Sequence, residues 1–187
     1  MGLSSTQKSV FTAAIIAFFM LLTRGSHVLT HVSLPDASLA LFLLGGLLLG
    51  RFVWFAAFFI LATFIDFGAA AFDPAQGFCL TNGYWGLIPA YGAMWLGGMW
   101  LSKQQNAFAW LPYTLVTMVT TLIAFVISTQ TYYLFSGRFP ANGVIESMQH
   151  GWEYLPSWMA FAAMYFAVVW LAVKALRNVK ALQTSKA

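Results

Sequence analysis

The chain of 187 residues is 60% hydrophobic, and only 7% of its residues are charged, 9 basic and 5 acidic. Soluble domains carry about 25% charged residues, so this composition excludes a water-soluble globular protein, a disordered chain and a nucleic-acid-binding protein. A membrane crossing needs about 20 apolar residues, so with loops the chain accommodates about six helices. We expect a single domain over residues 1–187.

Charged residues divide the chain into apolar segments, and each segment predicts one transmembrane helix. The stretch 37–72 is too long for one crossing, so we place a turn at Gly50-Arg51. The predicted fold is an all-α, six-helix transmembrane bundle, with helices over residues 9–23, 37–50, 52–72, 84–101, 108–135 and 155–173.

The basic residues predict how this bundle is oriented. Six crossings with both termini in the cytoplasm leave only Arg24 and Arg138 outside, and seven basic residues inside: Lys8, Arg51, Lys103, Lys174, Arg177, Lys180 and Lys186. This agrees with the positive-inside rule. The same topology collects the chemically versatile residues at the outer face: Asp36, Asp66, Asp73, Glu146, Glu153, His27, His31, His150 and Cys79.

The longest external segment, residues 66–85, contains the single cysteine, Cys79. The segment mixes helix-breaking residues with aromatic ones, and we expect Phe72, Phe78, Tyr84 and Trp85 to form an apolar rim that could cover a flat, bulky ligand. A lone cysteine is either a small hydrophobic residue that fills a gap or a soft thiolate ligand for a metal or metallocofactor. Both interpretations stay open on the residues alone.

Three other polar residues are candidates for this outer site. His27 and His31 are four residues apart, so a helix would place them on one face, but two histidines are a weak metal signal. Asp66 follows a long apolar run and is either solvated at the membrane boundary or directed into the bundle. A haem or quinone anchor would need His27 and His31 on different helices, whereas both lie in one predicted loop.

Small residues predict where helices pack closely. They are Ala13 and Ala17 in the first helix, Gly45, Gly46 and Gly50 in the second, and Gly92, Gly97 and Gly98 in the fourth. The sequence contains no nucleophile motif, Walker motif or Cys-x-x-Cys, so it gives no support to standard hydrolytic or redox catalysis, and active transport would need a partner ATPase, an ion gradient or a chemical trap.

These features together resemble the substrate-binding S-components of energy-coupling-factor (ECF) vitamin transporters. The cysteine segment from Asp66 through Cys79 to Tyr84, with the histidine-containing first loop, is similar to the cobalamin-specific S-components of the BtuM family. These occur in the inner membrane of proteobacteria, often without the ATPase module.

The resemblance implies a function and a site. Cys79 matches the family's loop cysteine, whose sulfur ligates the corrin cobalt axially, together with reductive-type removal of the upper cyanide of cyanocobalamin. His27, Asp66 and Tyr84 match polar positions around that site. Ala13 and Ala17 match the surface that docks on a coupling subunit, or are packing residues if the protein acts alone. The function expected is cobalamin uptake, and the alternatives are a membrane-bound cobalamin decyanase or an S-component for another vitamin.

Overall fold

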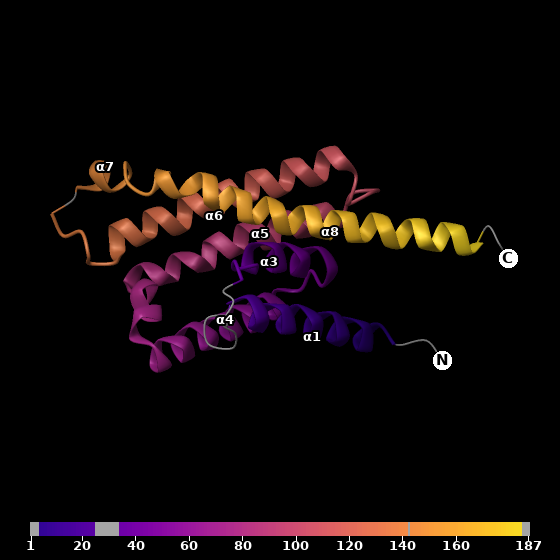
Figure 1. Cartoon of the computed structure of the whole chain (residues 1–187), viewed down its shortest axis with the longest axis horizontal. Coiled ribbons are helices and arrows are strands. Elements are labelled where there is room, and N and C mark those ends of the chain that lie inside the picture. The colour runs from indigo at the N-terminus through magenta and orange to yellow at the C-terminus, as the bar shows by residue number, and fades with distance from the viewer. Residues whose placement is uncertain (1–3, 25–33, 142, 185–187) are drawn as a thin grey trace.

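The computed structural model describes residues 4–24, 34–141 and 143–184. Within these ranges the chain is helical and contains no strand (Figure 1). The α-helices are α1 (Ser5–Arg24), α3 (Ser38–Leu48), α4 (Phe52–Phe72), α5 (Leu87–Ser102), α6 (Trp110–Phe135), α7 (Val144–Ser147) and α8 (Leu155–Thr184). Short 3₁₀ helices connect them: η1 (Pro74–Cys79), η2 (Asn82–Gly86) and η3 (Trp152–Tyr154).

Four helical segments in the described ranges are long and apolar enough to cross a membrane: α1, α4, α6 and the run Val144–Asn178, which includes most of α8. Their outer faces expose large apolar side chains, as Phe64 (73% exposed) and Val53 (67% exposed) on α4 illustrate. Water would make such a surface unstable, whereas lipid tails solvate it. The long apolar helices therefore fit a multi-pass membrane protein.

The two other predicted segments form shorter helices than expected. α3 has 11 residues and ends before Gly50, whose φ of +65° is a backbone conformation that glycine adopts without strain. α5 begins only at Leu87 because the residues from Asn82 to Gly86 form the 3₁₀ helix η2.

Other boundaries follow the sequence closely. α4 matches the predicted range 52–72, and α6 begins two residues after the predicted start at 108. α8 continues past 173 to Thr184, because its basic residues are good helix formers that leave the apolar part without ending the helix. Asp66 lies inside α4, six residues before its end.

α3 packs most extensively on α5, and glycines make the close approach feasible. A Cβ atom on Gly46 would overlap the carbonyl oxygen of Trp95, and one on Gly98 would overlap that of Leu43. The close-packing prediction is confirmed for Gly45, Gly46, Gly97 and Gly98. It is wrong for Gly92, where an added Cβ would meet no atom within 4 Å, and Gly50 serves the turn.

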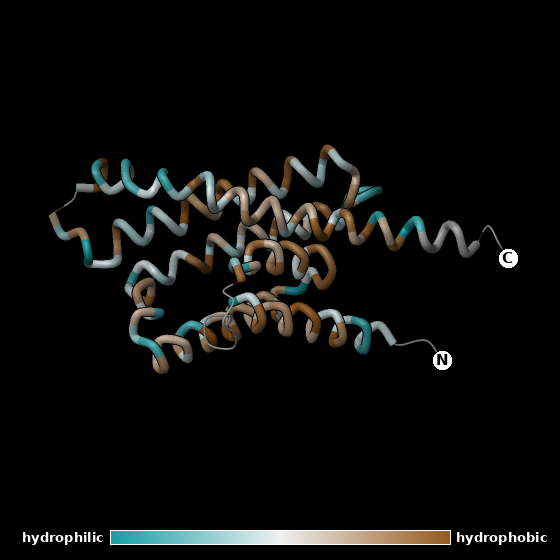
Figure 2. The backbone as a smooth tube through the Cα atoms, viewed as in Figure 1, coloured by the Kyte–Doolittle hydropathy of each residue, from teal (hydrophilic) through white to brown (hydrophobic). Residues whose placement is uncertain are grey.

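The helices form three adjacent pairs, and the aromatic core around Trp95 and Phe42 lies in the middle pair, α3 and α5. α1 and α4 lie together on one side, and α6 and α8 lie on the other with α3 and α5 between them (Figure 1). The hydrophilic residues gather mainly toward the helix ends (Figure 2). The start of α1 and the end of α8 lie at one end of the molecule, and η1, η2 and α7 lie at the opposite end.

Candidate functional site

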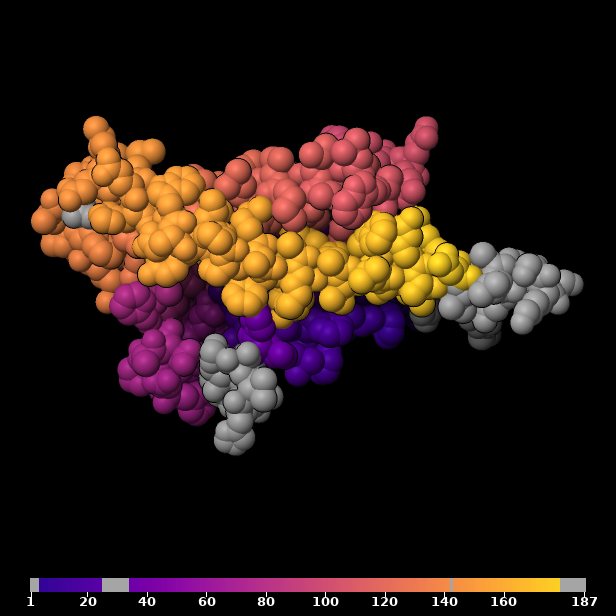
Figure 3. Space-filling model, turned by 45° about the horizontal axis from the view of Figure 1, so that its top comes forward, coloured from indigo at the N-terminus to yellow at the C-terminus, as the bar shows by residue number. Residues whose placement is uncertain are grey.

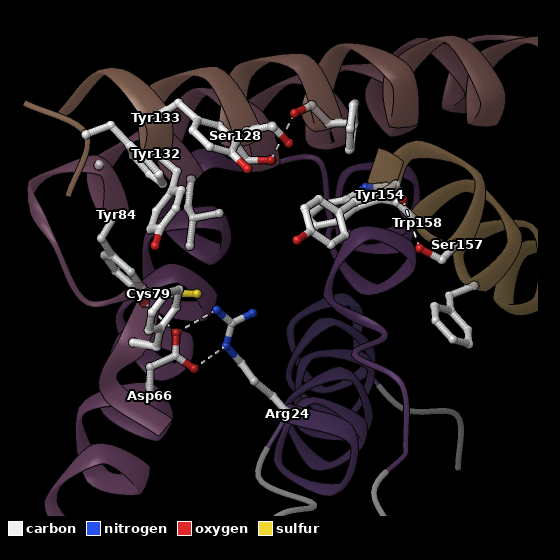
Figure 4. A pocket seen from close by; sticks show the side chains of 17 residues that line it. Arg24, Asp66, Cys79, Tyr84, Ser128, Tyr132, Tyr133, Tyr154, Ser157 and Trp158 are labelled. Carbon is white, nitrogen blue, oxygen red and sulfur yellow. Dashed lines mark hydrogen bonds and ion pairs between the residues drawn. The ribbon is translucent and has the colours of Figure 1, made fainter. Parts of the chain in front are cut away.

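A cavity of about 580 Å³ opens at the end of the molecule that carries η1 and η2. Its walls come from the end of α1, the outer part of α4, η1 and η2, the second half of α6 and the start of α8. Figure 4 shows the side chains converging on this space from those elements. Most of the lining is aromatic, and its two charged groups, Arg24 and Asp66, lie together on one side. The lining residues are Arg24, Asp66, Phe78, Cys79, Gly83, Tyr84, Leu87, Phe125, Ser128, Thr129, Tyr132, Tyr133, Phe139, Tyr154, Ser157, Trp158 and Phe161.

The charged side of the cavity is a bidentate ion pair between Arg24 and Asp66. Arg24 Nε donates to one carboxylate oxygen at 2.7 Å, and Nη2 donates to the other at 2.6 Å. The Arg24 side chain is 9% exposed and that of Asp66 is 19% exposed. Parallel hydrogen bonds of this kind fix orientation as well as charge. Of the two interpretations of Asp66, the structure supports the one directed into the bundle.

The remaining nitrogen of Arg24 connects α1 to two further elements. Nη1 donates to Asp36 (3.0 Å), to Ser38 Oγ (2.8 Å) and to Tyr91 Oη (2.7 Å). The Ser38 hydroxyl and backbone N–H in turn both donate to Asp36. One guanidinium group therefore connects α1, α3, α4 and α5 at the end of the bundle that carries the cavity.

Tyr84 completes the polar side from η2, where its hydroxyl donates to Asp66 at 2.8 Å. Burial raises the pKa of this phenol, so it stays a hydrogen-bond donor at neutral pH. Its position depends on two glycines that let η2 lie directly on α6. A Cβ on Gly83 or Gly86 would overlap the backbone or side chain of Thr131.

Cys79 ends η1, the 3₁₀ helix that follows α4. Pro74 begins this helix, and the Asp73 carboxylate caps it by accepting from the N–H of Ala75 at 3.0 Å. The thiol is free and exposed, and in Figure 4 its sulfur points into the cavity beside Arg24.

The electrostatic surroundings keep the Cys79 thiol protonated at neutral pH. Although part of the side chain is exposed, its partial burial against the cavity wall raises the pKa of the thiol, and the Asp66 carboxylate raises it further, while Arg138 and Arg24 lower it without cancelling these effects. A thiol with a raised pKa is a poor nucleophile, because only the thiolate reacts. A metal ion changes this, because a coordinating thiol is deprotonated outright.

Arg138 holds the residue next to Cys79. Its Nη2 donates to the carbonyl of Phe78 at 3.0 Å, and its guanidinium carbon lies 4.0 Å from the centre of the Phe78 ring. This contact joins η1 to the segment that follows α6, which also brings Phe139 against Tyr133. The cation–π contact and the hydrogen bond together fix the mouth of the cavity next to Cys79.

The opposite wall is aromatic and comes from α6 and α8. Tyr132 packs against Phe78, with ring centres 6.1 Å apart. Two polar atoms of this wall, Tyr132 Oη and Trp158 Nε1, are buried and have no hydrogen-bond partner among the described residues. Such atoms usually have partners, so these two are available to a ligand.

The structure brings together three of the site residues that the sequence predicts, Cys79, Asp66 and Tyr84, on one cavity wall. His27 and His31 lie outside the described residues. The predicted rim is half right: Phe78 lines the cavity, whereas Phe72 points outward at 83% exposure. Trp85 (60% exposed) likewise lies on the outer face, beside α4, because η2 turns only one side toward α6.

Sequence reasoning missed Arg24 and the whole wall formed by α6 and α8. A signal for Arg24 existed, since it is one of two basic residues placed on the side that holds every acidic residue. The wall residues gave none, because tyrosine and tryptophan are common at membrane interfaces.

No group of three or more histidine, cysteine or acidic side chains is arranged to hold a metal ion within 4–24, 34–141 and 143–184. No family model matches the chain, and no curated protein matches it significantly in sequence.

Proposed function

We propose that the protein is a membrane transporter that binds cobalamin at its extracytoplasmic face and mediates its uptake. The observation that carries the proposal is the Cys79 thiol, which is exposed to an aromatic cavity and lies beside the Arg24–Asp66 pair. A soft sulfur ligand suits cobalt, and aromatic walls suit a large, flat macrocycle. Cobalamin is thus the bound substrate, and Cys79 supplies one axial ligand to its cobalt.

Ligation by Cys79 is also compatible with loss of cyanide from cyanocobalamin. The thiol proton and the cyanide leave together as hydrogen cyanide, and the sulfur supplies the electron pair of the new cobalt–sulfur bond. The leaving cyanide takes the pair of the broken cobalt–carbon bond, so the cobalt stays trivalent and the exchange balances without an electron donor, in contrast to the reductive-type removal that the resemblance implies. The protein would then alter its substrate as it binds it.

The polar residues beside Cys79 have separate tasks in this proposal. Arg24 fixes the Asp66 carboxylate on the cavity wall, and Tyr84 donates to the same carboxylate. The free Tyr132 hydroxyl on the facing wall offers a hydrogen bond to the bound ligand. His27 belongs to the proposed set through the resemblance alone.

The proposed topology has six crossings, with both termini in the cytoplasm of a bacterium and the bundle in its inner membrane. α3 and α5 would be the short crossings, covered by the longer helices around them. Two observations support it. The start of α1 and the end of α8 lie at one end of the molecule, opposite η1, the 3₁₀ helix that Cys79 ends (Figure 1). Arg177, near the end of α8, donates to Asn106 in the connection between α5 and α6, which also carries Lys103, so these two basic residues support placing that connection in the cytoplasm.

A coupling subunit with its ATPase is a proposed partner that would dock at Ala13 and Ala17. Ala13 is 5% exposed and Ala17 packs on the core, so in this conformation both are used inside the chain. This favours the alternative in which the pair serves internal packing and the protein acts alone.

The test is the absorption spectrum of the detergent-purified protein with cyanocobalamin, beside the Cys79→Ser variant. Serine keeps the shape of the side chain and removes the soft ligand, so a shifted cobalt spectrum is expected for the wild-type protein only. An equal shift in Cys79→Ser would overturn the ligand assignment, and no binding by the wild-type protein would leave an S-component for another vitamin. Cyanide release without uptake by a cobalamin-dependent strain would instead identify a membrane-bound decyanase.

A further inference from the structure

A second cavity, of about 370 Å³, lies directly beside the first. It is bounded by the segment before α3, by Leu39 and Tyr91, and by the first turns of α8. Tyr165 of α8 fixes one edge, because its hydroxyl donates to the carbonyl of Pro35 at 2.5 Å. Trp158 and Phe161 line both cavities and so form a shared wall. α8, which carries them, runs along one face of the molecule (Figure 3).

The polar network of the first cavity continues into the second. Arg24 and Asp66 line the first cavity, whereas Asp36 and Tyr91, which the same guanidinium contacts, line the second. The Asp36 side chain is 46% exposed, so its carboxylate stays open to a further donor. The shared wall supplies the complementary group, because the indole nitrogen of Trp158 is a donor without a partner among the described residues.

These two groups match one chemical class, the primary carboxamide. An amide carbonyl accepts the hydrogen bond that an indole N–H offers, and an amide NH₂ donates to a carboxylate. Cobalamin carries such amides on short arms around its corrin ring. It is also larger than the drug-sized ligands that cavities of about 300–1,000 Å³ enclose, so neither cavity holds it alone.

We propose that the two cavities form one two-lobed ligand site. The first lobe receives the corrin face that Cys79 approaches, and the second receives carboxamide arms of the ring, with Trp158 donating to an amide carbonyl. This inference rests on the proposed function, since it takes cobalamin as the ligand. Phe161 and Trp158 move apart or rotate to admit the arms, and they select ligands with amide-bearing rims.

The test measures cyanocobalamin affinity by titration calorimetry in variants that leave Cys79 untouched. Trp158→Phe removes the indole N–H and keeps an aromatic ring, and we expect about tenfold weaker binding, the value of one hydrogen bond to a buried donor. Leu39→Phe fills the second lobe, and we expect a loss of more than about tenfold. The matched control, Leu48→Phe, makes the same change on an exposed part of α3 and should bind as the wild-type protein does.

The outcomes separate this inference from the proposed function. Wild-type affinity in Leu39→Phe overturns the second lobe, and wild-type affinity in Trp158→Phe overturns the amide contact, while the cobalt–thiolate spectrum remains in both. Absence of cyanocobalamin binding by the wild-type protein overturns the proposed function and this inference together. If Leu39→Phe does not give a monodisperse peak on gel filtration, Ala162→Leu fills the same lobe from α8 and decides the point.

Discussion

Replacing Arg24 by alanine tests whether this one side chain holds the outer ends of four helices together. Arg24 donates five hydrogen bonds: two to Asp66 and one each to Asp36, Ser38 and Tyr91. Its removal leaves the Asp66 carboxylate, whose side chain is 19% exposed, without its cation, and leaves the cavity wall without its tie to α1. We expect Arg24→Ala to be strongly destabilising.

The magnitude follows from the burial of the two partners. Breaking a buried ion pair by removing one member costs about 3–5 kcal/mol, because the other charge stays uncompensated. The contact with Asp36 adds little, since that side chain is 46% exposed and exposed pairs contribute about 1 kcal/mol or less. At about 2–4 °C per kcal/mol for a chain of this size, the melting temperature should fall by about 10 °C.

The assay is thermal unfolding of the detergent-purified protein by circular dichroism, with a second substitution to identify the cause. Asp66→Asn removes the orphaned charge, so the Arg24→Ala, Asp66→Asn double variant should recover part of the loss. The control Arg51→Ala removes an exposed cation and should change the melting temperature by about 1–2 °C at most. A melting temperature of Arg24→Ala within about 2 °C of wild type would refute the reasoning.

Two further predictions concern packing and proton release. Gly98→Ala should destabilise the protein by about 1–3 kcal/mol, because the new Cβ overlaps the Leu43 carbonyl. Gly92→Ala changes the same helix where the new Cβ meets no atom within 4 Å, so it should be neutral. Thermal unfolding compares the two variants, and equal melting temperatures would contradict the close contact of α3 and α5. Forming a cobalt–sulfur bond releases the Cys79 proton, and the raised pKa of that thiol keeps it protonated at neutral pH. For aquocobalamin, whose leaving group is neutral water, affinity should therefore rise about tenfold per pH unit between about pH 6 and 7 in the wild-type protein, and the same slope in Cys79→Ser would sink this explanation. Cyanocobalamin, whose cyanide leaves with the thiol proton, should show no such slope.

The helices could be predicted from the sequence because lipid leaves the backbone no other partner. Every N–H and C=O group in a bilayer must be satisfied locally, so an apolar interval between charges becomes a helix. α4 and α6 accordingly lie where the hydropathy pattern places them. Exact lengths depended on local geometry instead, as the turn at Gly50 and the 3₁₀ start of η2 show for α3 and α5.

The part of the site that is close in sequence was equally accessible to prediction. Cys79 and Tyr84 share one segment, and a lone thiol among aromatic residues is enough to indicate a candidate ligand site there. The sequence identified Asp66 as a candidate site residue, but it did not show whether the side chain points to solvent or into the bundle. An acidic residue near the end of an apolar helix is compatible with solvent and with the bundle interior, and sequence alone does not separate them.

Only the tertiary structure decided which residues, distant in the sequence, become neighbours in the site. Arg24 is 42 positions from Asp66 and 67 from Tyr91, and no periodic pattern connects positions so far apart. Trp158 reaches the cavity because α8 packs beside α6 and contacts α3. Composition and local pattern thus determined the membrane class and indicated the cysteine segment as a candidate ligand site, because solvation acts on each segment separately. The cavity, its ion pair and its second lobe depend on contacts between segments, which arise only when the helices pack.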